Sequence, residues 1–163
     1  MIGNNIERER NILIIEDNFD NRMAALAAMR ELSLGAVLTS NVNEAIRLLD
    51  KNDFFAVFSD VSAGKSIIRE CIVRYVPHLI VSANSSSVEI LYSPITTKLL
   101  PEEDEEIFLC RVNVIFNRKK EVQVWKRVYK ILLELYGEEY LTILQEARKR
   151  YRIREGEGYK MRI

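Results

Sequence analysis

The chain has 163 residues, of which 48% are hydrophobic and 29% are charged, and its 24 basic and 24 acidic side chains balance. This length suits one domain with an appendage, and this composition suits a soluble globular fold. No apolar run is long enough to span a membrane, and the polar segment 1–10 lacks the apolar core of a secretory signal. We therefore expect a cytoplasmic protein with no membrane partner.

The charges are unevenly distributed along the chain. Residues 1–117 carry 11 basic and 17 acidic side chains, whereas residues 118–163 carry 13 basic and 7 acidic ones. The sequence thus predicts an acidic body with a basic C-terminal tail, which favours an anionic partner for the tail.

Short apolar runs alternate with amphipathic segments over the first half of the chain. Strands are expected at residues 11–15, 36–40, 54–58 and 78–82. The helices between them are expected to begin after Asn18 or Asp20, after Asn41 or Asn43, and at Ser66. This alternation is typical of βαβ units and a parallel sheet.

Carboxylates stand just after two of the predicted strands. Glu16 and Asp17 come after residues 11–15, and Asp60 follows the apolar run 54–58. The carboxyl ends of parallel strands open into the crevice where open α/β sheets bind ligands, so these three side chains should converge there. Carboxylates this close repel one another unless a cation lies among them, and hard oxygen ligands suit Mg²⁺.

Two further polar side chains continue this order along the chain. Ser82 ends the run 78–82 and is followed by a small residue, and Lys98 lies in the segment Ile95-Thr-Thr-Lys-Leu-Leu100. An acid pair, an aspartate, a serine and a lysine after successive strands resemble the receiver domain of two-component response regulators. The resemblance covers roughly residues 10 to 118. It implies an α/β fold of the flavodoxin-like (CheY-like) class, a doubly wound five-stranded parallel sheet, here with a C-terminal helical extension.

The resemblance also implies roles for these residues. Glu16, Asp17 and Asp60 would bind Mg²⁺, with no other cofactor. Asp60 would accept a phosphoryl group from a histidine kinase or phosphotransfer protein. Ser82 and Lys98 would contact the phosphate and switch partner binding. The chemistry would be limited to self-phosphorylation and autodephosphorylation, which excludes a metabolic enzyme.

Two features depart from the receiver pattern. The segment after Asp60 lacks the Met-Pro pair of receivers and is shorter, and Leu99 stands where the family has proline. These departures favour an alternative, a degenerate receiver that is not phosphorylated and acts as a protein interaction module.

The fifth strand has two candidates. In the first, it is formed by residues 96–100, and a helix with proline and acids in its first turn begins at Pro101. In the second, it is formed by residues 112–116 and followed by a helix over 121–135, so that Lys119 or Lys120 competes with Lys98. We favour the first, because the turn after Lys98 resembles that of receivers.

The predicted organisation is a leader at 1–10, a receiver-like domain at 11–118 and a helical, basic extension at 119–163. Apolar spacing predicts helices at 121–136 and 138–152, which would form a hairpin on the domain or a homodimer interface. The basic run 148–154 contains a tyrosine and offers phosphate contacts and stacking to a nucleic acid. The chain shows no recognition-helix pattern, which disfavours that partner.

Two other motifs have structural explanations. Gly64-Lys-Ser66 lacks the earlier glycine of a phosphate-binding loop, because Ser59 occupies that position. His78 is the single histidine of the chain and has no cluster of metal ligands around it in the sequence, so we expect a structural role.

Overall fold

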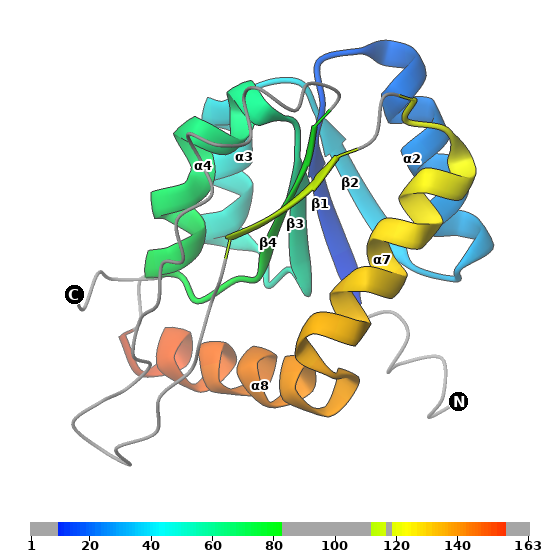
Figure 1. Cartoon of the computed structure of the whole chain (residues 1–163). Helices are drawn as coiled ribbons and strands as arrows, with labels where there is room; N and C mark the ends of the chain where they lie inside the picture. Colours follow the sequence, from blue (N-terminus) through cyan, green and yellow to red (C-terminus); the bar gives the residue numbers. More distant parts are fainter. Residues whose placement is uncertain (1–9, 83–111, 117–118, 156–163) are drawn as a thin grey trace.

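The computed structural model describes residues 10–82, 112–116 and 119–155. Within these residues, one sheet of parallel strands has the order β2-β1-β3-β4-β5 (Figure 1). The strands are β1 (Asn11–Ile15), β2 (Gly35–Thr39), β3 (Ala56–Ser59), β4 (His78–Ser82) and β5 (Val112–Phe116). This strand order confirms the predicted flavodoxin-like sheet, in which the direction of winding reverses between β1 and β3 and leaves a crevice at the carboxyl edge.

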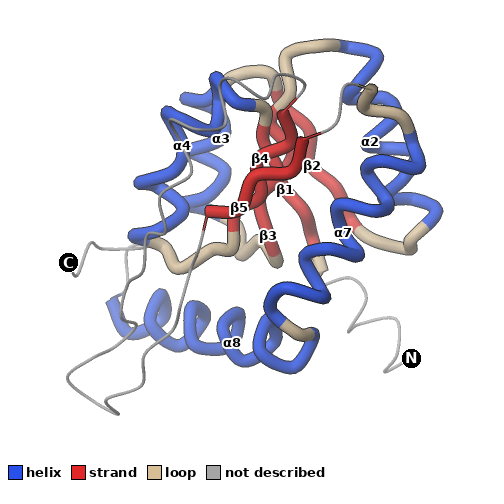
Figure 2. Tube along the Cα trace, viewed as in Figure 1, coloured by secondary structure: helices blue, strands red, loops and turns tan. Residues whose placement is uncertain are grey.

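Helices cover both faces of the sheet. They are α2 (Phe19–Glu31), α3 (Val42–Lys51), α4 (Val61–Val73), α7 (Val122–Tyr136) and α8 (Glu138–Glu155). Figure 2 shows α2 and α7 on one face, α3 and α4 on the other, and α8 running beneath the end of the sheet. None of the helices in the described ranges is long and apolar enough to cross a membrane.

Asparagine side chains start the first two of these helices. Asn18 accepts the backbone N–H of Asn21 at 2.9 Å, and Asn41 accepts that of Glu44 at 3.1 Å. Each satisfies a donor that the first turn of a helix leaves unpaired. Of each predicted pair of caps, the first residue is therefore the one used.

The fifth strand is Val112–Phe116, so the preference for residues 96–100 is wrong. β5 pairs with β4 along its whole length, from Val112 opposite His78 to Phe116 opposite Ser82. The segment Val112-Asn-Val-Ile-Phe116 is rich in the β-branched and aromatic residues that suit a strand. Residues 96–100, Lys98 included, lie outside the described residues.

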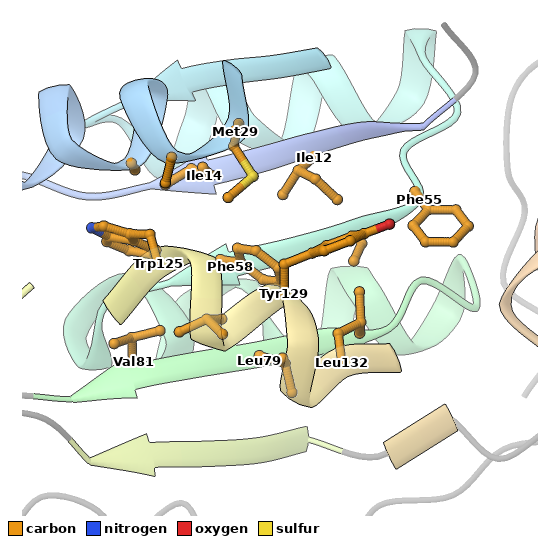
Figure 3. Close-up of a cluster of buried hydrophobic side chains, with 14 of the residues drawn as sticks. Ile12, Ile14, Met29, Phe55, Phe58, Leu79, Val81, Trp125, Tyr129 and Leu132 are labelled. Atoms are coloured by element: carbon orange, nitrogen blue, oxygen red, sulfur yellow. The ribbon is translucent and has the colours of Figure 1, made fainter. Parts of the chain in front are cut away.

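α7 is part of the main hydrophobic core. Trp125, Val128, Tyr129 and Leu132 are at most 7% exposed and pack in one cluster with residues of β1, β3 and β4 (Figure 3). Burying each such side chain stabilises the fold by about 2 kcal/mol. α7 and the strands therefore share one hydrophobic core.

α8 closes the amino-terminal end of the sheet through buried polar contacts. Arg148 is 0% exposed; its guanidinium pairs with Asp53 Oδ1 at 3.1 Å and donates to the carbonyl oxygens of Tyr75, at 2.9 Å, and Phe54. Glu138, at the other end of α8, pairs with Arg10. The first residue of the basic run 148–154 is thus used inside the fold.

Candidate metal and phosphoacceptor site

The three predicted carboxylates converge at the carboxyl edge of the sheet. One ligand atom from each of Glu16, Asp17 and Asp60 lies within 4.8 Å of the others. Ile15 of β1 pairs with Ser59 of β3, so the residues that follow the two strands emerge side by side. Glu16 and Asp60 are buried and Asp17 is exposed, which gives the cluster an opening to solvent.

A buried lysine, 104 residues after Glu16 in the sequence, also contacts this cluster. Lys120 Nζ lies 2.6 Å from Glu16 Oε1, and both side chains are less than 10% exposed. Burial raises the pKa of the Glu16 carboxyl, and the charge and hydrogen bond of Lys120 oppose that rise. Lys120 is one of the two lysines that the second strand assignment offered in place of Lys98, and it contacts this cluster through Glu16.

Asp60 also caps the amino-terminal end of α4. Its Oδ1 accepts the backbone N–H of Ala63 at 2.8 Å and the hydroxyl of Ser62 at 3.3 Å, and its carbonyl oxygen accepts the N–H of Gly64 at 2.7 Å. Within the described parts of the chain, its Oδ2 accepts only a long contact, 3.4 Å, from the N–H of Asp17. Among the described residues, Oδ1 therefore accepts its hydrogen bonds from the first turn of α4, and Oδ2 is the more weakly hydrogen-bonded oxygen.

The start of α4 differs from the sequence prediction. The sequence predicts a turn after Asp60 and a helix from Ser66, whereas the helix begins at Val61. The signal for the earlier start is an aspartate in the N-cap position, and Gly64 obscures it because glycine disfavours helix interiors.

Gly64 lets α4 approach the sheet closely beside the site. A Cβ at this position would lie 2.8 Å from Cδ1 of Ile80 and 3.1 Å from Oγ of Ser59. The glycine is thus required by packing, and its position inside a helix is unlike that in a phosphate-binding loop.

Ser59, which precedes Asp60, is held by His78. The His78 Nε2 and Ser59 Oγ atoms lie 2.6 Å apart, and both residues are fully buried. Burial lowers the pKa of His78 to about 3, so the ring is neutral. Its Nδ1 has no hydrogen-bond partner among the described residues. This placement agrees with the structural role expected of His78.

Ser82 ends β4 at the same edge of the sheet and is buried. Its role as a switch hydroxyl stays a prediction, and Lys98 is not among the described residues.

Sequence reasoning missed one residue at the site, Arg22. Its Nη1 donates to the backbone carbonyl oxygens of Glu16 at 2.8 Å and Asp17 at 2.9 Å, and its guanidinium lies over the ring of Phe19. The signal in the sequence is a cation in the first turns of a helix, where the helix dipole disfavours positive charge.

No protein-family model matches this sequence, and no curated protein matches it. Solved structures do match. The receiver domain of a sensor histidine kinase from Pseudomonas aeruginosa, solved with magnesium in its active-site cleft, is 20% identical with a TM-score of 0.51, over 82% of this chain and 98% of that chain. The chemotaxis response regulator CheY4 of Vibrio cholerae is 9% identical with a TM-score of 0.53, over 76% and 98%.

The chain has the fold of CheY-like receiver domains. A de novo designed Rossmann 2x3 protein matches too, at 12% identity and a TM-score of 0.56, over 80% of this chain and 93% of that one. Because a designed protein shares the architecture, the likeness describes the fold, and an argument for function must rest on the site.

Proposed function

We propose that this chain is a response-regulator-like signalling domain that binds Mg²⁺ at Glu16, Asp17 and Asp60 and accepts a phosphoryl group on Asp60. The observation that carries the proposal is the approach of these three carboxylates to within 4.8 Å of one another. Lys120 balances one of the negative charges. A hard divalent cation is suited to the remaining ones, since Mg²⁺ binds through one or two carboxylates and keeps several waters.

In phosphoryl transfer, the protein contributes mainly by positioning the reacting groups and by stabilising charge. In the proposed step, Oδ2 of Asp60 forms the new O–P bond while the N–P bond of a phosphohistidine donor breaks, and the released imidazole nitrogen takes up a proton. Oδ2 suits this role because Oδ1 is hydrogen-bonded to the first turn of α4. Bound Mg²⁺ would neutralise negative charge on the phosphoryl oxygens.

Lys120 takes, in this proposal, the phosphate-contacting role that the resemblance gave to Lys98. It lies at the carboxyl edge, and its ammonium group is already held there by Glu16. Ser82, at the end of β4, would be the hydroxyl that responds. The response would be a population shift toward a partner-binding state. The partner that donates the phosphoryl group would be a histidine kinase or phosphotransfer protein, met in the cytoplasm.

An amide NMR titration with Mg²⁺ and then beryllofluoride tests this function, with Asp60→Asn as the control. We expect Mg²⁺-dependent shifts at Asp17, Asp60 and Ser82 that grow with beryllofluoride and vanish in the control. Trp125 is the single tryptophan of the chain and offers a fluorescence readout in parallel. A chain that does not respond to millimolar Mg²⁺ would refute the proposal.

A degenerate receiver that acts as an interaction module is the second candidate. The observation in its favour is that the site is partly satisfied without a ligand, because Lys120 pairs with Glu16 and Asp60 caps α4. The same titration separates the two candidates. Binding of nucleic acid by the basic tail stays a prediction; of the run 148–154, Arg148 is buried inside the fold.

A further inference from the structure

Arg22 holds the turn that carries the acid pair. One guanidinium nitrogen, Nη1, donates to two consecutive carbonyl oxygens, those of Glu16 and Asp17, at 2.8 and 2.9 Å. The chain leaves β1 at this point and reverses into α2, and the N–H of Arg22 itself is bonded to the carbonyl of Asn18. Backbone and side chain of one residue therefore tie the turn to the helix.

These hydrogen bonds are made to the backbone of Glu16 and Asp17, and not to their carboxylates. Within the described residues, Arg22 forms no ion pair with a carboxylate; the cation that contacts Glu16 directly is Lys120. The guanidinium instead lies 5.7 Å from the centre of the Phe19 ring, a cation–π contact. Its influence on the carboxylates is therefore exerted through the orientation of the backbone that bears them.

We infer that Arg22 is a positioning residue of the cation site. It holds the backbone of residues 16 and 17 so that both carboxylates face Asp60 at the separation a small cation requires. This inference rests on the proposed function, because that function is what assigns a cation to the site. Groups that orient metal ligands commonly change metal affinity by about tenfold or more when they are removed.

An effect of Arg22 through its charge and an effect through its geometry would change the Mg²⁺ affinity in different ways, so two variants can separate them. Arg22→Gln removes a positive charge near the site, whereas Arg22→Lys keeps the charge but loses the planar, rigid guanidinium. If Arg22 positions the acids, both variants weaken Mg²⁺ binding, by about tenfold. If only its charge matters, Arg22→Gln tightens binding and Arg22→Lys leaves it unchanged, and that pattern would overturn the inference.

Arg30→Gln is the matched control. It makes the same change of charge on the same helix, at an exposed position in the last turn, and we expect its Mg²⁺ affinity to remain within about twofold of the wild type since exposed charges far from the site are screened. Affinities are measured by Trp125 fluorescence at a temperature where every variant is folded. A merely structural role for Arg22 would lower the melting temperature without changing the Mg²⁺ dissociation constant.

A second measurement keeps this inference separate from the proposed function. Backbone NMR order parameters of Glu16, Asp17 and Asn18, recorded without Mg²⁺, should fall in both Arg22 variants and stay unchanged in Arg30→Gln. A wild-type chain that binds no Mg²⁺ would refute the proposed function alone. Unchanged order at residues 16–18 in both Arg22 variants would overturn the role of Arg22, whatever the wild type binds.

Discussion

Oδ1 of Asp60 accepts the backbone N–H of Ala63 at 2.8 Å, so the residue proposed to take a phosphoryl group is also the N-cap of α4. Chemistry at this carboxylate and the start of the helix are therefore linked. The link is close, because Gly64 packs the same turn against Ser59 and Ile80. A substitution that removes the acid also changes the helix, and the two effects have to be separated.

Comparison of Asp60→Asn with Asp60→Ala separates them. Asparagine caps helices about as well as aspartate, whereas alanine cannot accept the N–H of Ala63, and loss of a cap costs about 1 kcal/mol. We expect Asp60→Ala to lower the free energy of unfolding by about this amount relative to Asp60→Asn, measured by urea denaturation. Equal stability of the two variants would show that the cap does not contribute.

Lys120→Met should be strongly destabilising at neutral pH, because it leaves the buried carboxylate of Glu16 without its positively charged partner. Breaking a buried ion pair in this way costs about 3 kcal/mol. The matched control is Lys126→Met, whose ion pair with Glu31 is longer, at 3.4 Å, and more exposed. That variant should change stability by less than about 1 kcal/mol in the same denaturation experiment.

The cost of Lys120→Met should also depend on pH. Burial raises the folded-state pKa of Glu16 above its ordinary value of 4.5, so the folded state binds more protons than the unfolded state and stability falls as pH rises through this window. Lys120 opposes the rise in the pKa of Glu16. Its removal therefore raises that pKa further, and the pH range over which stability falls extends to higher pH. Unfolding measured from pH 7 down to pH 5 should show the destabilisation shrink. A constant difference would mean that Glu16 is not the group responsible.

His78 should remain neutral in the folded protein under mildly acidic conditions. Burial lowers its pKa from 6.5 to about 3, so the unfolded state binds the proton more readily and stability falls as pH drops below 6.5. The chain has one histidine, so its ring proton signals are unambiguous. We expect no titration shift of these signals between pH 8 and pH 5. A midpoint near 6.5 in the folded state would contradict the buried bond to Ser59.

Arg148→Met should destabilise the chain and release α8 from the end of the sheet. The substitution leaves the Asp53 carboxylate and two carbonyl oxygens without their donor, at a cost of about 3 kcal/mol. Arg127→Met, at an exposed position on α7, is the control and should be close to neutral. Hydrogen exchange should show faster exchange along α8 in the first variant only. Adding Asp53→Asn to Arg148→Met should restore part of the stability, because it removes the uncompensated charge.

The sheet and the acidic site followed from local patterns. The runs 11–15 and 78–82 are strands because they are short, apolar and rich in β-formers, and the structure places strands at those residues. The meeting of Glu16 and Asp17 with Asp60 followed from one geometric rule, that parallel strands end at the same edge.

The choice of the fifth strand could not be made by such patterns. Residues 96–100 and 112–116 both contain strand-forming residues, and only the pairing of β5 with β4 selects between them. That choice then determines which cation reaches the acids. Lys120 lies far from Glu16 in the sequence, so no local spacing predicts their contact.

By itself the sequence determined the fold class, the edge of the sheet that bears the site and the three carboxylates there, because each depends on a short segment and on the direction of its strand. Tertiary structure alone decided that Lys120 pairs with Glu16, that Arg148 is buried beneath the sheet and that α7 belongs to the core. These features depend on contacts between distant segments, where a charged side chain is stable only if its partners are brought to it by the packing of the whole domain.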